Sequence, residues 1–169
     1  MGYAIVIILG IVVDQISKWA AATYLQPVGS IEVIPNFFYL TYVENRGAAW
    51  SFLSDVPWGI YVLTGMSALS SLLFIYLLIK APTKRLRWTL SVITAGTIGN
   101  LIDRARLGHV IDFADFRFGD YVFPTFNVAD SMLVIGVILL VFFLSMEKEP
   151  EAALAEGGPE EEISLDRKG

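Results

Sequence analysis

Long apolar stretches alternate along the chain with shorter polar or mixed segments. Four of these stretches are long and apolar enough for membrane-spanning helices, which need about 20 residues each. They cover residues 3–25, 58–79, 88–102 and 131–146. The last two are shorter than the others and have charged residues at one end. The pattern therefore predicts a bundle of four transmembrane helices.

Two of the connecting segments have the composition of β-strands. Residues 31–43 are rich in Val, Ile, Phe, Tyr and Thr and are broken by Pro35 and Asn36, which indicates a short pair of strands. Residues 116–123 have the pattern of a hairpin around a Gly-Asp turn. The predicted fold class is therefore an α-helical membrane protein, a four-helix transmembrane bundle with a small extracytoplasmic β-sheet.

Other residues indicate how the first apolar stretch and the segment before the second one relate to the membrane. The first apolar stretch contains Asp14 and has no basic region before it, so we expect an uncleaved helix rather than a signal peptide. Residues 54–57 are expected to form a turn at the interface, with Trp50 and Trp58 at the level of the lipid headgroups.

The distribution of basic residues predicts the orientation of the bundle. The connection between the second and third apolar stretches is short and basic, whereas the longer connection before it carries only Arg46. Because short cytoplasmic loops are enriched in Lys and Arg, we expect this connection and both chain termini on the cytoplasmic side. Its basic residues are Lys80, Lys84, Arg85 and Arg87. On the opposite side, Arg104, Arg106 and Arg117 weaken the contrast without reversing it.

Composition agrees with a membrane domain followed by a different kind of tail. The chain has 169 residues, is 55% hydrophobic and has a mean hydropathy of +0.61, which is too apolar for an ordinary soluble domain. From Glu147 onward there are 8 acidic and 3 basic residues; subtraction from 17 and 12 leaves 9 and 9 for the rest. We therefore predict a membrane domain over 1–146 and a disordered acidic cytoplasmic tail over 147–169.

Composition also excludes several kinds of chemistry. The chain has no cysteine, so it has no disulfide, no thiolate metal site and no cysteine nucleophile. Its single histidine, His109, rules out a histidine-based metal cluster. We expect no metal and no cofactor. No basic aromatic surface indicates a nucleic-acid partner.

Five ionisable residues are predicted at or near membrane depth, where each needs a partner or a function. They are Asp14, Lys18, Asp103, Asp112 and Asp130. Asp14 and Lys18 are four residues apart on one helix face, and a simple ion pair between them is favoured over a direct catalytic role.

The third apolar stretch ends in a polar helix face. Gly96, Asn100, Asp103 and Arg104 share this face by their spacing, and Ala95 with Gly99 forms a small-residue pair that lets another helix approach. Ordinary helix packing, with Asp103 and Arg104 paired at the outer surface, explains the glycines. It does not explain Asn100, whose amide also needs partners at that depth.

Two aspartates are delivered to the same depth by the predicted topology. Asp112 lies just beyond the outer end of the third stretch, and Asp130 opens the fourth from the same side. Two close carboxylates share a proton, so one can act as a base on water while the other polarises a carbonyl. The alternatives are a helix-capping role for Asp130 and a surface position for Asp112 near an arginine. Asp115 and Asp120 are expected to be surface acids.

Other chemistries remain as alternatives. A dyad of Ser17 and Lys18 is disfavoured because neighbouring helical residues do not face each other, and His109 has no serine near it in sequence. A proton-coupled carrier would use Asp14, Asp103 and Asp130 as a relay, but such a relay requires acids spread through the membrane. A membrane scaffold without catalysis leaves these polar residues unexplained.

Five short motifs, in order between the four stretches, resemble those of the bacterial lipoprotein signal peptidase (signal peptidase II) family. They are Asp14-Gln15 with Lys18, Asn45-Arg46-Gly47-Ala48-Ala49, Gly99-Asn100-Leu101-Ile102-Asp103-Arg104, Ile111-Asp112-Phe113, and Phe126-Asn127-Val128-Ala129-Asp130. The resemblance covers nearly the whole chain up to Met146. Trp50, where the family usually has Phe, and the acidic tail depart from its pattern.

The resemblance implies an aspartic endopeptidase of the bacterial inner membrane, with its active site near the outer leaflet. Such enzymes remove signal peptides from diacylglyceryl-modified prolipoproteins and cut before the lipidated cysteine. Asp112 and Asp130 match the catalytic pair. The substrate-binding or site-supporting positions are Asp14, Lys18, Asn45, Gly47, Asn100, Asp103, Arg104 and Asn127. The expected partners are prolipoproteins and membrane lipid, and the expected state is a monomer.

Overall fold

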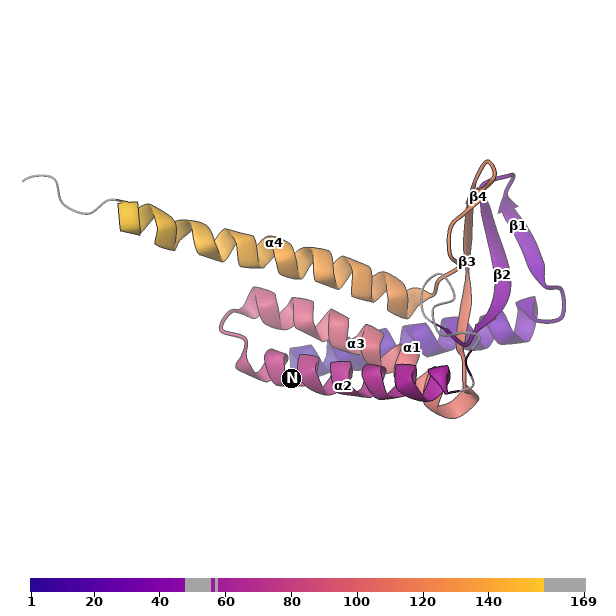
Figure 1. Ribbon diagram of the computed structural model, residues 1–169, viewed down its shortest axis with the longest axis horizontal. Helices are drawn as coiled ribbons and strands as arrows, with labels where there is room; N and C mark the ends of the chain where they lie inside the picture. Colours follow the sequence, from indigo (N-terminus) through magenta and orange to yellow (C-terminus); the bar gives the residue numbers. More distant parts are fainter. Residues whose placement is uncertain (48–55, 57, 157–169) are drawn as a thin grey trace, which may run out of the picture.

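The computed structural model describes residues 1–47, 56 and 58–156, with side chains up to Met146. It contains all four predicted helices, with a π-helical turn, η1, at the end of the first (Figure 1). The helices are α1 (Gly2–Ala20) with η1 (Ala21–Leu25), α2 (Gly59–Lys80), α3 (Lys84–Leu107) and α4 (Val128–Glu156). Within the described residues, three segments are long and apolar enough to cross a membrane: Gly2–Leu25, Gly59–Lys80 and Val128–Met146.

The third predicted span, α3, is long enough but more polar than the other three helices. At about 1.5 Å per residue its 24 residues extend about 36 Å, beyond the thickness of a hydrocarbon core. Its polarity is accommodated because it packs against α1, α2 and α4. The hydroxyls of Thr89, Ser91 and Thr94 donate to carbonyls four residues earlier. Helices rather than lipid therefore surround much of α3, which is why its sequence is less apolar.

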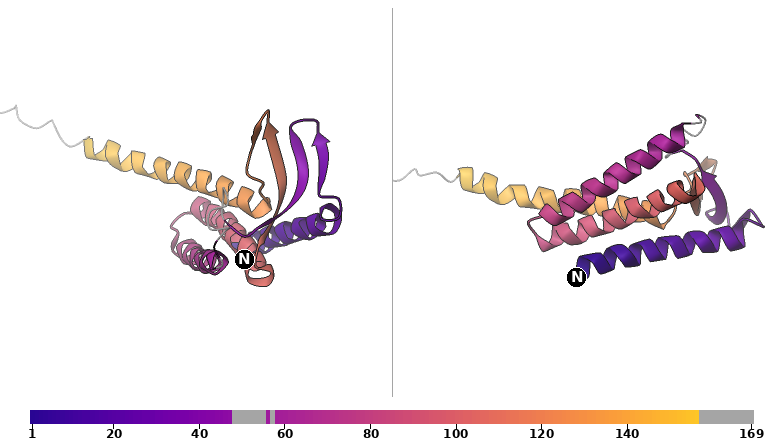
Figure 2. Two further views of the ribbon diagram at one scale, coloured as in Figure 1. Left: turned by 45° about the vertical axis from the view of Figure 1, so that its right-hand side comes forward. Right: turned by 90° about the horizontal axis from the view of Figure 1, so that it is seen from below.

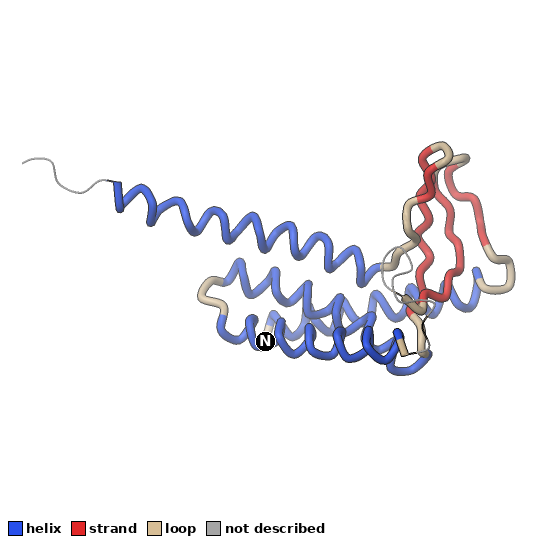
Figure 3. Tube along the Cα trace, in the orientation of Figure 1, coloured by secondary structure: helices blue, strands red, loops and turns tan. Residues whose placement is uncertain are grey.

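A four-stranded antiparallel sheet stands across one end of the helices (Figures 1 and 3). Its order is β1 (Ser30–Ile34), β2 (Phe38–Asn45), β3 (Val110–Phe118) and β4 (Tyr121–Val122). The predicted strand pair and hairpin are both confirmed. Asn36 and Gly119 have φ values of 57° and 63° in the two turns, a conformation that Asn and Gly tolerate best. Apart from residue 56, the predicted turn at 54–57 lies outside the described residues, as does Trp50.

Helices α1 and α3 run toward the sheet, and α2 and α4 run away from it. The N-terminus, the α2–α3 turn and the far end of α4 lie at the end of the molecule opposite the sheet (Figures 1 and 2). The basic residues of 80–87 are therefore at the end remote from the strands. Asp112 in β3 and the first turn of α4 are at the sheet end, as the predicted topology requires. Helix α4 continues to Glu156, ten residues into the predicted tail; the disorder of the tail stays a prediction.

Close packing in the bundle depends on glycines of α3. A Cβ atom on Gly99 would lie 2.6 Å from the Asp14 carboxylate, and one on Gly96 would lie 2.6 Å from the Ala129 carbonyl oxygen. The absence of these side chains lets α1 and the start of α4 touch α3. The predicted close approach at the end of α3 is therefore present, and it brings a carboxylate against the helix.

Candidate active site

Asp112 is placed by the central strand β3 and is 2% exposed. Two amides hold its carboxylate. Asn45, at the end of β2, donates through Nδ2 to Oδ2 at 2.9 Å, and Asn127 donates through Nδ2 to Oδ1 at 2.7 Å. Both carboxylate oxygens are thus satisfied by neutral donors, with no cation in direct contact among the described residues.

Asp130 is placed by the first turn of α4, where it forms a reciprocal cap with Asn127. The Asp130 backbone N–H donates to Asn127 Oδ1 at 3.0 Å, and the Asn127 N–H donates to Asp130 Oδ2 at 3.2 Å. This arrangement is the Asn/Asp counterpart of a capping box. The helix-capping alternative is therefore correct as far as it goes. It does not exclude catalysis, because the second oxygen of Asp130 points to another partner.

Asn100 joins the two aspartates through Asn127. Its Nδ2 donates to Asp130 Oδ1 at 2.7 Å, and its Oδ1 accepts from Asn127 Nδ2 at 3.1 Å. A continuous chain of hydrogen bonds therefore runs from Asp112 through two asparagines to Asp130. The structure brings the predicted aspartates into one network, together with the two asparagines that were expected to support them.

The environment of Asp112 favours its protonated form. Burial, followed by the charge of Asp130, raises the pKa of Asp112 from 3.8 to about 7; the hydrogen bonds from Asn45 and Asn127 and the charge of Lys18 oppose this rise. A carboxyl group with such a pKa can hold a proton near neutral pH and donate it. The electrostatic effect of Asp130 on Asp112 is the behaviour expected of a pair that shares a proton.

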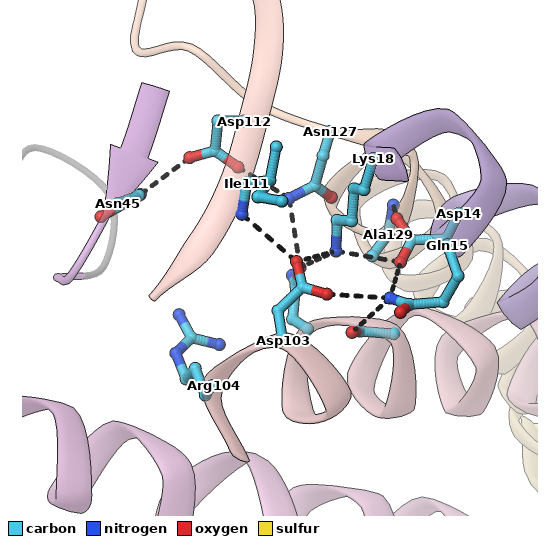
Figure 4. Close-up of polar contacts among 12 residues, drawn as sticks. Asp14, Gln15, Lys18, Asn45, Asp103, Arg104, Ile111, Asp112, Asn127 and Ala129 are labelled. Carbon is cyan, nitrogen blue, oxygen red and sulfur yellow. Dashed lines mark hydrogen bonds and ion pairs between the residues drawn. The ribbon is translucent and has the colours of Figure 1, made fainter. Parts of the chain in front are cut away.

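Lys18 lies behind this pair and is 2% exposed (Figure 4). Its ammonium contacts Asp14 Oδ2 at 2.9 Å and Asp103 Oδ2 at 3.1 Å, and donates to Asn100 Oδ1 at 2.9 Å. The predicted ion pair between Asp14 and Lys18 is confirmed. Asp103, however, pairs with Lys18 from a different helix and not with its neighbour Arg104.

Gln15 completes this buried cluster, and our list of candidate residues missed it. Its Nε2 donates to Asp103 Oδ1 at 2.9 Å, to Asp14 Oδ2 at 3.2 Å and to the Gly99 carbonyl at 3.3 Å. The signal in the sequence was an amide in the middle of an apolar span, next to a carboxylate. An uncharged polar residue at that depth also needs partners.

Arg104, in α3, lies on the other side of the site, where its side chain reaches α2 and the residues after β2. It donates to Ser67 Oγ at 3.2 Å and to the Gly47 carbonyl at 3.3 Å, and its Nε is buried without a partner among the described residues. Gly47 is in turn bound through its N–H to Asn45 Oδ1 at 2.9 Å. Arg104 and Gly47 thus support the turn that carries Asn45.

Three other polar residues, Asp115, Asp120 and Ser17, lie outside the network that joins Asp112 to Asp130. Asp115 was expected at the surface, but it is 3% exposed and binds Arg117 Nη2 at 2.7 Å and Thr41 Oγ1 at 2.9 Å, because β3 pairs with β2 at this point. That expectation is wrong for Asp115, whereas Asp120 is exposed as predicted. Ser17 donates to the Asp14 carbonyl and is not paired with Lys18.

A sequence model described as "Signal peptidase (SPase) II" matches residues 6–146. The chain belongs to the signal peptidase II family. A protein named "Lipoprotein signal peptidase" from Caldanaerobacter subterraneus subsp. tengcongensis is 49% identical over 144 residues, covering 83% of this chain and 94% of that protein. One of the same name from Acinetobacter baylyi is 42% identical over 147 residues, covering 83% and 82%.

Solved structures of two bacterial membrane enzymes have the same fold. One is 30% identical with a TM-score of 0.75 and covers 96% of this chain and 94% of its own. The other is 34% identical with a TM-score of 0.74, covering 85% and 92%. Membership of a peptidase family favours the peptidase over the carrier and scaffold alternatives. The carrier alternative is also disfavoured because Asp14 and Asp103 lie together on one ammonium rather than spread through the bundle.

Proposed function

We propose that this chain removes signal peptides from diacylglyceryl-modified prolipoproteins, with a water molecule activated between Asp112 and Asp130. Family membership supports the substrate class. The observation that carries the mechanism is the hydrogen-bonded chain through Asn127 and Asn100, which connects two carboxylates of unlike environment. Asp112 is buried in a strand, whereas Asp130 is partly exposed at the start of a helix.

The reaction uses the pair in opposite protonation states. Asp130, as the base, removes a proton from water, and the water oxygen attacks the carbonyl carbon before the lipidated cysteine. Asp112, as the acid, donates its proton toward the carbonyl oxygen, for which its pKa of about 7 suits it. Collapse of the tetrahedral intermediate breaks the C–N bond. Asp130 gives the proton that it took from water to the leaving amine, and one hydroxyl of the intermediate returns a proton to Asp112 as the C=O bond re-forms. The products are a signal peptide with a new carboxyl group and a cysteine with a free amine.

We also propose how the enzyme lies in the membrane. Helix α3 also spans the membrane, in addition to α1, α2 and α4. Both termini are cytoplasmic, and the sheet lies at the outer surface of the inner membrane. The basic residues of 80–87 support this orientation because they are at the end opposite the sheet. We also propose a monomer, because four spans of one chain are enough to enclose the site.

Cysteine accessibility tests this topology directly, because the chain has no cysteine of its own. A single cysteine at Asp120, in the turn between β3 and β4, is expected to react with an impermeant thiol reagent added to spheroplasts. One at Lys84 is expected to react only after the membrane is opened. The reverse pattern would invert the proposed orientation.

Cleavage of a diacylglyceryl-modified prolipoprotein tests the function. Wild type should cut before the lipidated cysteine, and Asp112→Asn and Asp130→Asn should each lower the rate by about 10²–10⁴-fold or more, as expected for loss of a proton-transfer group. Asp120→Asn, which removes an exposed acid from the same segment, is the matched control and should remain active. Full activity in either dyad variant would refute the pair. An inert wild type would return the carrier alternative, to be tested by proton flux.

A further inference from the structure

The buried cluster behind the site holds the chain immediately before each catalytic aspartate. Asp14 Oδ1 accepts the backbone N–H of Ala129 at 2.9 Å, and Ala129 precedes Asp130. Asp103 Oδ2 accepts the backbone N–H of Ile111 at 3.2 Å, and Ile111 precedes Asp112. Figure 4 shows the Lys18 ammonium joined by dashed lines to the carboxylates of Asp14 and Asp103.

Lys18 is the group that joins these two contacts. An ammonium has three N–H donors, and those of Lys18 are matched by three acceptors, on Asp14, Asp103 and Asn100. The first acceptor holds the start of α4, the second holds the start of β3, and the third donates onward to Asp130. No donor is left over, so the position of each partner is fixed relative to the other two.

We propose that Asp14, Lys18 and Asp103 form a clamp that sets the separation of the Asp112 and Asp130 carboxylates, with Lys18 as the positioning residue. The inference rests on the proposed function of that pair. β3 and α4 belong to different layers of the molecule, and the segment between them, residues 119–127, is mostly turn and irregular chain. The clamp ties both elements to α1 and α3, which pack closely along the bundle.

Stability alone does not account for this cluster. Moving charges out of water is costly, and a buried ion cluster is often no more stabilising than apolar side chains of the same volume. Here one ammonium lies between two carboxylates at 2.9 and 3.1 Å, in a bundle that packs with apolar side chains at its other end. A geometric role explains why charged residues stand where apolar ones would suffice for packing.

The test compares pH–rate profiles, because two coupled carboxylates titrate as a unit whose coupling depends on their separation. Among the described residues, the charged groups near the pair are Lys18, Asp14, Asp103 and Arg104. Lys18→Met removes the centre of the clamp. Asp14→Asn is the smaller structural change. Its amide oxygen can still accept the Ala129 N–H, but its NH₂ group cannot pair with the Lys18 ammonium. Ile93→Ala, in a fully buried position of α3 outside the cluster, is the stability control.

Both clamp variants should lower kcat by about 10²-fold, the effect of misplacing reacting groups by about 1 Å, with little change in KM. Both should also narrow the bell-shaped pH–rate profile. Weaker coupling between the two carboxylates brings the two apparent pKa values of the pair closer together. Ile93→Ala should melt at a lower temperature and keep the wild-type profile. Where Lys18→Met does not accumulate in the membrane, Asp14→Asn decides the question.

Two results would overturn the clamp. In the first, the limbs keep their spacing and shift together, in opposite directions for Lys18→Met and Asp14→Asn, which is the effect of charge alone. In the second, Asp14→Asn keeps wild-type kcat and profile. Failure of the proposed function looks different, since wild type itself would then not cleave the prolipoprotein, or the dyad variants would remain active.

Discussion

The two ends of the helical bundle are built in different ways. At the end remote from the sheet, Ala81, Leu86, Leu90 and Ile93 form a buried core with partly buried Phe and Leu side chains of α2 and α4. At the sheet end, the same helix α3 presents Asn100 and Asp103, and their contacts with α1 and α4 are hydrogen bonds and ion pairs.

This contrast shows which end tolerates change. Apolar packing is non-directional, so a cavity or a small shift costs free energy of unfolding without disturbing chemistry. The polar end is directional, because each donor needs its acceptor at one distance and angle. We therefore expect mutations at the remote end to affect stability and mutations at the sheet end to affect catalysis as well.

The largest difference between the two ends should come from a matched pair of glycines, one at each end. A Cβ on Gly99 would lie 2.6 Å from Asp14 Oδ2, and one on Gly136 would collide with Ile93 Cγ1. Gly99→Ala should lower kcat by about 10²-fold because it displaces Asp14. Gly136→Ala should cost about 1–3 kcal/mol of stability by overpacking and leave the kcat of the folded enzyme unchanged.

Gly65→Ala in α2 is the control for this comparison, because a Cβ there meets nothing within 4 Å. Cleavage rates and melting temperatures in detergent would be measured for all three variants. Equal losses of kcat in Gly99→Ala and Gly136→Ala would show that the two ends do not differ in the proposed way.

A second prediction separates the two roles of Asn127, which caps α4 and also donates to Asp112 and Asn100. Serine is a good N-cap residue, so Asn127→Ser should preserve the cap of α4. It removes the amide donor to a carboxylate, an interaction of about 1.5–3 kcal/mol, and should lower kcat by about 10–10²-fold. Asn127→Ala loses about 1 kcal/mol of capping in addition. If the serine variant cleaves at the wild-type rate, the amide has only a capping role.

The positions of the helices and strands could be predicted from the sequence better than the side-chain contacts within the site. Apolar length predicted all four helices, and turn residues such as Gly119 located the hairpin. The pair of Asp112 and Asp130 followed from topology, since both lie at the ends of elements on one side. Family resemblance supplied Asn45 and Asn127, whose roles have no periodic signal.

Partnerships across the chain were not predictable from spacing. The i, i+4 spacing predicts the pair of Lys18 with Asp14. No local pattern predicts the pair of Lys18 with Asp103, which is 85 positions away in sequence. Asp115 was expected at the surface together with Asp120, whereas the register of β2 against β3 buries it beside Thr41. Such contacts depend on how the elements dock, and no local pattern encodes docking.

A third prediction concerns the pH dependence of stability at the sheet end. Because the pKa of Asp112 is raised from 3.8 to about 7, the folded chain binds this proton more tightly than the unfolded chain. The resulting stabilisation is complete below about pH 4 and is lost as the pH rises through about 7. Asp112→Asn has no such proton, so its melting temperature relative to wild type should be higher at pH 8 than at pH 5.

The control for this measurement is Asp120→Asn, whose carboxyl is exposed in the neighbouring turn. Its melting temperature relative to wild type should be the same at both pH values. A relative melting temperature of Asp112→Asn that also stays constant between them would show that burial in β3 does not favour the protonated acid.

The smallest effect on catalysis is expected at a polar contact of the sheet that lies outside the network of Asp112 and Asp130. Thr41 Oγ1 donates to the buried Asp115 at 2.9 Å, and Arg117 holds the same carboxylate from the solvent side. Thr41→Val keeps the shape of the side chain and removes two hydrogen bonds, one to Asp115 and one shared with the hydroxyl of Ser30, so it should cost about 1–3 kcal/mol of stability. Cleavage should be unchanged, because Asp115 belongs to none of the hydrogen bonds that join Asp112 to Asp130. A fall in kcat without a fall in melting temperature would contradict this prediction. It would show that the hydrogen bonds on which catalysis depends extend from the site into the β2–β3 part of the sheet.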